Sequence, residues 1–259
     1  MDILSAYIAL IPVTLAQSLS LSFVVLAVMI PFRILNFPDL TSEGAYPLGG
    51  CVCGVALVAG VPAFPALLLA AAAGFLAGCS TAFIHLKFRI HTLLAGILIT
   101  TMLYSINLRI MGKANLPVFN EGKVYDLLAG LGLSGSVTKI LIAGGLAVIT
   151  YAALNLWFLT ERGTAMRAVG ANSDMAEAQG INVWRATVGG IGLAGAFSAF
   201  SGALMVQSQG FSDVNMGLGI LINALAALMI GEAIVGKKTV ARQMLAPFAG
   251  AVIYYQLIS

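Results

Sequence analysis

Charged side chains are scarce in this sequence. Asp, Glu, Lys and Arg make up only 9% of its 259 residues, whereas hydrophobic residues make up 60%. Soluble domains contain about 25% charged and roughly 45–50% apolar residues. A soluble domain of this length could not bury so much apolar surface. A water-soluble enzyme or binding module is therefore excluded, and the lipid bilayer is the expected solvent.

Cysteine and histidine are also rare, with three of the first and two of the second. An odd number of cysteines in apolar surroundings argues against a disulfide framework. Cys51 and Cys53 have no further metal ligands nearby, and His85 and His91 are too far apart to share one helix face as a metal pair. We expect no metal site and no catalytic residues, and we expect the cysteines to pack as small apolar side chains.

Several functional motifs are missing. The sequence contains no G-x-x-x-x-G-K-[ST] phosphate-binding loop, so any ATP chemistry must come from another chain. It contains no G-x-S-x-G nucleophile motif either, which disfavours an intramembrane hydrolase. The net charge of +3 is spread over several loops and does not suggest a nucleic-acid partner. We therefore expect a protein that is not itself an enzyme.

Long apolar runs dominate what is present. A membrane-spanning helix needs about 20 residues, and continuous rather than alternating apolar runs disfavour a β-barrel. The sequence predicts an all-α, polytopic transmembrane helix bundle of about eight spans, forming one domain over residues 1–259. The expected spans lie near 4–31, 45–60, 64–84, 92–111, 138–158, 186–208, 218–235 and 243–258.

The basic residues predict the orientation, because Lys and Arg are enriched in cytoplasmic loops. One set of alternate loops holds Arg33, Lys87, Arg89, Arg162, Arg167, Arg185, Lys237, Lys238 and Arg242. The other set holds Arg109, Lys113, Lys123 and Lys139, so nine plus four account for all 13 basic residues. The richer side is expected to be cytoplasmic, with the N-terminus outside.

One polar insert, residues 160–185, falls on that cytoplasmic side. It holds the charged residues Glu161, Arg162, Arg167, Asp174, Glu177 and Arg185. Thr160 or Thr164 and the stretch from Asn172 to Asp174 can cap two short helices, which Gly170 and Gly180 are expected to end. The insert is either an ordinary amphipathic interfacial loop or a docking surface for a soluble partner that uses Met175, Ala176 and Gln179.

A second polar interruption covers residues 35–50. Pro38 and Pro47 are expected to prevent a continuous helix here. Irregular backbone at membrane depth is tolerated only where protein buries it or where it lines a water-filled cavity. The carboxylates in this stretch could bind the ammonium group of a solute or cap a helix N-terminus. The alternative is a solvated cytoplasmic turn, and the charge count favours a gate over a central site.

Isolated polar residues occur in or near the apolar spans, and each could line a path or bond to a neighbouring helix. Together with the interruption, they give the candidate translocation path Asn36, Asp39, Ser42, Glu43, Asn107 and Asn223. Glu232 is a further acid that is costly to bury, although it lies near Lys237.

Small residues also recur every four positions. The rows are Ala194, Ser198 and Gly202; Gly195, Ala199 and Ala203; and Ala70, Gly74 and Gly78. Such rows let helix backbones approach closely in lipid. They favour packing inside one subunit over an interface between subunits.

Two stretches resemble a known transporter family. The first is TAMRAVGANSDMAEAQGINVWRATVGGIGLAGAFSAFSGAL, residues 164–204, and the second is LNFPDLTSEGAYPLGG, residues 35–50. They resemble ABC importer permeases of the branched-chain amino acid and ribose type, and are most similar to those assigned to aromatic amino acids. In that family the first stretch docks on the ATP-binding subunit. The resemblance therefore assigns coupling to Arg167, Gly170, Asn172, Ala176, Gln179 and Gly180.

The resemblance also implies a set of partners and a location. The expected partners are cytoplasmic subunits that bind ATP and Mg, a second permease subunit, identical or not, and an extracytoplasmic solute-binding protein. The expected location is the bacterial inner membrane, where the chain would move a small solute, expected to be an amino acid, by alternating access. The alternative is an ion-coupled secondary transporter or channel, for which Glu232 and the acids at 39–43 are the candidate coupling groups.

Overall fold

The computed structural model describes residues 3–119, 121–126 and 135–258, with side chains from Leu10 onward. Helices dominate it: α1 (Ile3–Met29), the π-helix η1 (Ile30–Ile34), α2 (Thr41–Val58), α3 (Ala63–Phe88), α4 (Thr92–Met111), α5 (Gly135–Leu159), α6 (Glu161–Ala171), α7 (Ser173–Ala178), α8 (Val183–Gln209), α9 (Ile220–Val235) and α10 (Val240–Ile258). The predicted all-α class is confirmed, and each of the eight predicted apolar stretches forms a helix.

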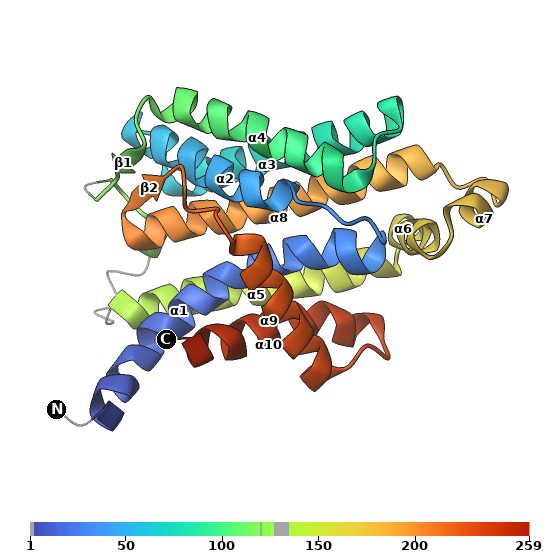
Figure 1. The fold of residues 1–259 in the computed structure, drawn as a ribbon. Helices are drawn as coiled ribbons and strands as arrows, with labels where there is room; N and C mark the ends of the chain where they lie inside the picture. Colours follow the sequence, from blue (N-terminus) through green and yellow to red (C-terminus); the bar gives the residue numbers. More distant parts are fainter. Residues whose placement is uncertain (1–2, 120, 127–134, 259) are drawn as a thin grey trace.

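The helices pack in two groups that share a central contact (Figure 1). Helices α2, α3, α4 and α8 pack together in one group, and α1, α5, α9 and α10 in the other. The groups meet where α1 lies against α8, which itself also contacts α2 and α3. Helices α6 and α7 project from one end of the bundle, and a small sheet covers the other end. The two ends of the bundle therefore differ, with two short helices at one end and a sheet at the other.

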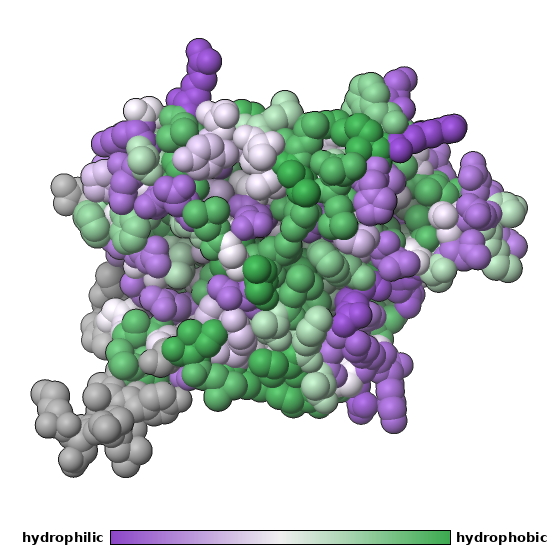
Figure 2. Space-filling view, viewed as in Figure 1, coloured by the Kyte–Doolittle hydropathy of each residue, from purple (hydrophilic) through white to green (hydrophobic). Residues whose placement is uncertain are grey.

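The surface is that of a membrane protein. Figure 2 shows hydrophobic side chains across the middle of the molecule and hydrophilic ones gathered towards both ends. Within the described residues, five helical stretches are long and apolar enough to cross a membrane: Leu10–Ile34, Ala63–Phe88, Thr92–Met111, Gly135–Leu159 and Val183–Gln209. Helices α2, α9 and α10 complete the bundle, but they are shorter or less apolar than these five stretches.

The course of helix α2 shows that one prediction from the sequence, a break at Pro47, is wrong. The helix begins at Thr41 and continues through Pro47, which was expected to interrupt it. Proline lacks an N–H and frees the carbonyl four residues earlier, which here belongs to Glu43. Gly217 packs against that carbonyl and against the Pro47 ring. Gly217 therefore packs at the point where the proline frees a carbonyl, and the backbone that is not helical is confined to residues 35–40.

A two-stranded sheet was not predicted. Strand β1 (Asn115–Pro117) pairs antiparallel with β2 (Phe211–Asp213), and Leu116 lies opposite Ser212. Leu116 and Val118 pack with Cys51 and Val214 in a small apolar cluster at this end of α2. The sheet thus closes the end of the bundle opposite α6 and α7.

The small-residue rows bring α8 into backbone contact with its neighbours. A Cβ atom at Gly74 would overlap the carbonyl oxygen of Gly195, and one at Gly78 would overlap that of Ile191. A Cβ atom at Gly49 would overlap the carbonyl oxygen of Ala199. Packing within one subunit, the favoured interpretation of these rows, is confirmed.

Substitution of Gly195 by Leu should destabilise the bundle. Overpacking a tight core costs up to about 3 kcal/mol in the free energy of unfolding, and the α3 backbone leaves no space here. Gly145→Leu is the matched control, because a Cβ at Gly145 meets no described atom within 4 Å. Thermal unfolding of both variants in detergent tests this. Equal stability of the two would contradict the backbone contact.

The orientation should be testable by labelling single cysteines. Asn115 and Ser173 are exposed and lie at opposite ends of the bundle. In a background where the three native cysteines are replaced, we expect a membrane-impermeant thiol reagent to label Asn115→Cys from outside the cell. Ser173→Cys should react with the reagent only after the cell membrane has been permeabilised. Labelling of both from the same side would overturn the predicted topology.

Candidate functional site

The chain turns sharply between η1 and α2. The backbone N–H of Phe37 donates to the carbonyl oxygen of Pro31 at 2.8 Å, closing a turn in which Asn36 adopts a left-handed conformation with φ of 49°. Asn is among the few residues that tolerate this region. Asn36 is exposed at the end of the bundle that carries α6. Its structural role is therefore to redirect the backbone into the bundle.

The residues that follow are buried. Asp39 is only 2% exposed, and its Oδ1 accepts hydrogen bonds from the backbone N–H of Thr41 at 2.9 Å and from the Thr41 hydroxyl at 2.5 Å. The Thr41 and Thr81 hydroxyls lie 2.7 Å apart, and the Thr100 hydroxyl donates to the carbonyl of Leu40 at 3.0 Å. Contacts with α3 and α4 thus hold this segment, and the solvated-turn alternative is wrong.

The next acid, Glu43, stabilises the start of another helix. Its Oε1 accepts a hydrogen bond from the backbone N–H of Gly219 at 2.9 Å. Gly219 is the N-cap of α9, with φ of 75°. A carboxylate is favourable there because the helix N-terminus carries partial positive charge. Of the two roles that the sequence suggested for these carboxylates, the structure shows helix capping, at Asp39 for α2 and at Glu43 for α9.

The segment between β2 and α9 explains how Glu43 reaches α9. It runs back along α2, with Ser212 beside Gly54, Met216 beside Gly50 and Gly217 against the Glu43 carbonyl. Helix α9 consequently begins beside the first turn of α2, within the bundle (Figure 1). Two helix N-termini and two acids are thereby brought together in the interior.

A cavity of about 250 Å³ opens beside this junction. Its lining comes from α2, α4 and the turn before α9: Glu43, Gly44, Pro47, Thr100, Tyr104, Asn107, Val214, Asn215, Gly217 and Leu218. Asn107 is fully buried, and neither amide atom of its side chain has a hydrogen-bond partner among the described residues. Buried polar groups are nearly always paired, so this cavity offers polar groups that a ligand could satisfy.

The cavity unites only part of the predicted path. Glu43 and Asn107 line it together. Ser42 is buried nearby, where its carbonyl accepts from Ser198 at 2.8 Å and its own hydroxyl lacks a partner within the described chain. Asn223 lies elsewhere, because its Oδ1 accepts from the Tyr254 hydroxyl at 3.0 Å and so ties α9 to α10.

Among the lining residues that sequence reasoning missed are the two other polar side chains from α4, Thr100 and Tyr104. With Asn107 they are spaced by four and three positions along α4, which places all three on one helix face. That periodicity of polar side chains in an apolar helix was a signal that could have identified them.

The polar insert forms the two predicted short helices. The Thr160 hydroxyl accepts from the backbone N–H of Gly163 at 3.5 Å to cap α6, and Asn172 Oδ1 accepts from that of Met175 at 3.0 Å to cap α7. Gly180 has the expected left-handed conformation, with φ of 80°. The prediction that Gly170 ends the first helix is wrong, since α6 continues to Ala171.

Three of the predicted coupling residues face the body of the protein. Gly170 packs so closely on the Ile34 carbonyl that a Cβ atom would overlap it. Ala176 is 3% exposed, and Arg167 donates to the Phe158 carbonyl at 3.3 Å. These residues hold the insert against η1 and α5. Asn172, Gln179, Gly180 and Met175 are exposed, with Met175 63% accessible.

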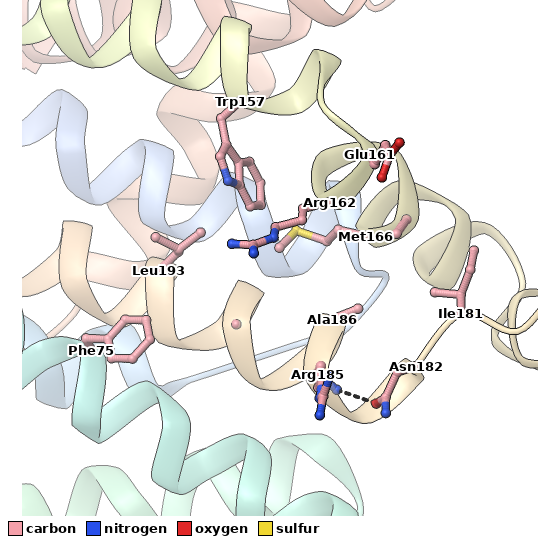
Figure 3. A pocket seen from close by; sticks show the side chains of 12 residues that line it. Phe75, Trp157, Glu161, Arg162, Met166, Ile181, Asn182, Arg185, Ala186 and Leu193 are labelled. Atoms are coloured by element: carbon pink, nitrogen blue, oxygen red, sulfur yellow. Dashed lines mark hydrogen bonds between the residues drawn. The ribbon is translucent and has the colours of Figure 1, made fainter.

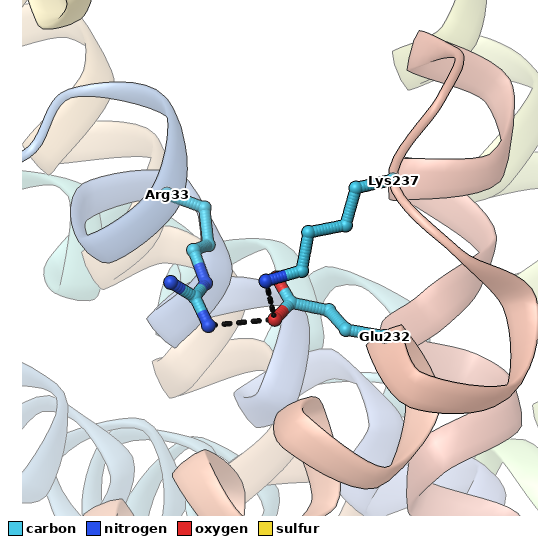
Figure 4. A network of polar contacts seen from close by, with 3 residues as sticks. All are labelled: Arg33, Glu232 and Lys237. Carbon is cyan, nitrogen blue, oxygen red and sulfur yellow. Dashed lines mark hydrogen bonds and ion pairs between the residues drawn. The ribbon is translucent and has the colours of Figure 1, made fainter.

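An ion cluster joins η1 to α9 at the same end (Figure 4). Oε2 of Glu232 accepts from Arg33 at 2.6 Å and lies 2.7 Å from Nζ of Lys237, while the Glu232 side chain is only 3% exposed. The other carboxylate oxygen, Oε1, has no hydrogen-bond partner in the described chain. Since η1 contacts α6 through Ile34 and α9 through Arg33, it links the insert to α9.

Comparison with known proteins agrees with this architecture. The family model described as branched-chain amino acid transport system / permease component matches residues 11–258. A tyrosine transport system permease protein of Clostridioides difficile is 38% identical over 240 residues, which cover 93% of this chain and 79% of that protein. An uncharacterized protein of Rickettsia prowazekii is 31% identical over 249 residues, covering 95% and 86%. No solved structure matches the chain. This multi-pass membrane protein belongs to the family of permease components of branched-chain amino acid transport systems.

Proposed function

We propose that this permease component carries an amino acid across the bacterial inner membrane as part of an ABC importer. ATP and Mg would bind to separate cytoplasmic subunits, because this chain has no phosphate-binding loop. The observation that carries the proposal is the cavity between α2, α4 and the turn before α9, which is lined by both Glu43 and the unpartnered Asn107.

The chemistry of the cavity suits a zwitterion with an apolar side chain. Glu43 can accept from an α-ammonium group, and the Asn107 amide can donate to an α-carboxylate. Val214, Leu218 and the Tyr104 ring supply apolar contacts. The relative that is 38% identical is described as a tyrosine permease. We therefore assign an aromatic amino acid as the solute.

Transport would be driven from the α6–α7 insert. An ATPase that grips the exposed face of α7 would move α6, which packs directly on η1 at Gly170 and Ile34. Helix η1 continues into the buried segment that ends at Glu43, and Arg33 connects η1 to α9. Movement of the insert would thereby shift both sides of the cavity and alternate its access, as in rigid-body switching.

The remaining partners follow from the two ends of the bundle. A solute-binding protein would deliver the amino acid at the β1–β2 end, opposite the insert. A second permease subunit would complete the path. Two of the acids argue against ion-coupled transport, since Asp39 is bonded to Thr41 and Glu232 is held by two cations. Coupling ions would have to displace these contacts.

Removal of the Asn107 amide should impair uptake without loss of stability. Leaving a polar group unpaired in the interior is unfavourable, so Asn107→Leu should be neutral or stabilising for folding. If the amide binds the solute, the KM for aromatic amino acid uptake should rise about ten- to hundredfold, which is the value of a hydrogen bond to a charged group. Uptake by the assembled transporter, normalised to the amount in the membrane, is the measurement.

Two companion variants sharpen that test. Glu43→Gln retains an oxygen that accepts from Gly219 but removes the charge, so it should reduce uptake while preserving the α9 cap. Asn155→Leu is the control, because Asn155 lies in α5 and does not line the cavity. Wild-type uptake by both Asn107→Leu and Glu43→Gln would sink the proposed site.

A charge on α7 should break the connection to the ATPase. Met175→Glu alters an exposed side chain, so the protein should still insert and fold. We expect loss of co-purified ATP-binding subunit and of solute-stimulated ATP hydrolysis. Lys238→Gln makes the same change of net charge at an exposed residue of the same end, and should leave both unchanged. Normal assembly and transport by Met175→Glu would show that the ATPase docks elsewhere.

A further inference from the structure

A second, larger cavity lies at the α6 end of the bundle and is separate from the proposed path. It has a volume of about 650 Å³ and is lined by Phe75, Trp157, Glu161, Arg162, Ala165, Met166, Ile181, Asn182, Arg185, Ala186, Gly189 and Leu193. Figure 3 shows that these residues come from the end of α5, from α6, from the α7–α8 connection and from the first part of α8, with Phe75 contributed by α3. Several of them belong to the polar insert 160–185, but none was among the coupling or path residues predicted from the sequence.

The rim of this cavity is cationic. In Figure 3 the guanidinium group of Arg162 extends into the space below the Trp157 indole, and Glu161 points away from it. Neither the Arg162 nor the Arg185 side chain has a hydrogen bond or ion pair to any described residue. The rim therefore carries two guanidinium groups without a protein partner and only one carboxylate, and guanidinium is well suited to hold phosphate.

The opposite part of the cavity is apolar and open to the membrane. Leu193 lies eight residues beyond Arg185 in α8, a rise of about 12 Å along the helix. One leaflet of the hydrocarbon core is about 15 Å thick. Leu76 and Leu156, the chain neighbours of the lining residues Phe75 and Trp157, are each 67% exposed. The cavity thus extends from a polar rim along about 12 Å of α8, a length close to the depth of one leaflet.

We propose that this cavity binds an anionic phospholipid of the leaflet that surrounds α6. The phosphate of its headgroup contacts Arg162 and Arg185, Trp157 lies at the interface, and an acyl chain extends along Gly189 and Leu193 to Phe75. A free phosphate ion would occupy only the rim, and a soluble peptide would not match the membrane-facing part. The shape and the charge together favour a lipid.

Gly189 provides a way to fill the cavity without disturbing the fold. It lines the cavity, and a Cβ atom placed on it would meet no described atom within 4 Å. Gly189→Leu should therefore block the acyl chain while α8 stays intact. Gly145→Leu on α5 makes the same change at an equally open position outside the cavity, and serves as the matched control.

The test is native mass spectrometry of the purified full chain, released from nanodiscs that contain equal amounts of phosphatidylglycerol and phosphatidylcholine. We expect the wild-type protein and Gly145→Leu to retain phosphatidylglycerol selectively. Retention should fall about thirtyfold in Arg162→Gln/Arg185→Gln, the combined effect of two basic residues near the membrane surface. Gly189→Leu should lose the lipid with its charges unchanged, whereas Arg242→Gln, an exposed arginine of the same end, should not.

Three outcomes would overturn the proposal. Equal retention by all variants would show that the lipid binds elsewhere. Displacement of phosphatidylglycerol by millimolar inorganic phosphate, with phosphate bound in its place, would reduce the site to an anion pocket. Loss of permease self-association in Gly189→Leu, measured in the same spectra, would show that the surface contacts a second copy of the chain.

Discussion

The approach of α8 to α2 and α3 is the constraint on which the rest of the structure depends. In a membrane the lipid chains are as apolar as the helix side chains, so helices associate through close packing and hydrogen bonds. Here backbone meets backbone at Gly49 and Ala199, and again at Gly74 and Gly195. Ser198 adds a hydrogen bond to the carbonyl of Ser42. These contacts fix the first turn of α2 relative to α8, and with it the place where Glu43 meets α9.

The fixed position of this junction allows two helix N-termini to lie inside the bundle, which would otherwise be energetically unfavourable. Two helix N-termini inside a bundle expose backbone N–H groups that water would otherwise satisfy. Asp39 and Glu43 each accept one such group, so the acid and the helix end neutralise each other locally. The amide of Asn107 lines the same cavity as Glu43 and has no hydrogen-bond partner in the described chain. The Asn107 amide is therefore available to a ligand that binds and leaves.

The sequence predicted the helices well and the contacts between distant segments poorly. Apolar length and small-residue spacing are local signals, and the predicted span 92–111 coincides with α4. Pro47 and Gly170 were misread because a local rule assigns them to breaks, whereas their neighbours Gly217 and Ile34 stabilise them inside helices. Strands β1 and β2 are too short to show a pattern, and they form because two connections meet. Glu43 and Asn107 were both predicted, but only the fold places them in one cavity.

The stretch from Ile30 to Glu43 explains why a signal at the insert would reach the cavity. π-Helical turns and left-handed residues depart from regular α-helical hydrogen bonding, and they often occur at functional positions. This stretch contains both, at η1 and at Asn36, followed by irregular backbone up to Thr41. Its two ends are nevertheless firmly held, by α6 and Glu232 at η1 and by α9 at Glu43. Because the segment is irregular and its two ends are held, a movement of α6 would be taken up within this segment. In the proposed transport cycle, a movement of α6 would therefore change the entrance to the cavity rather than the packing of α8.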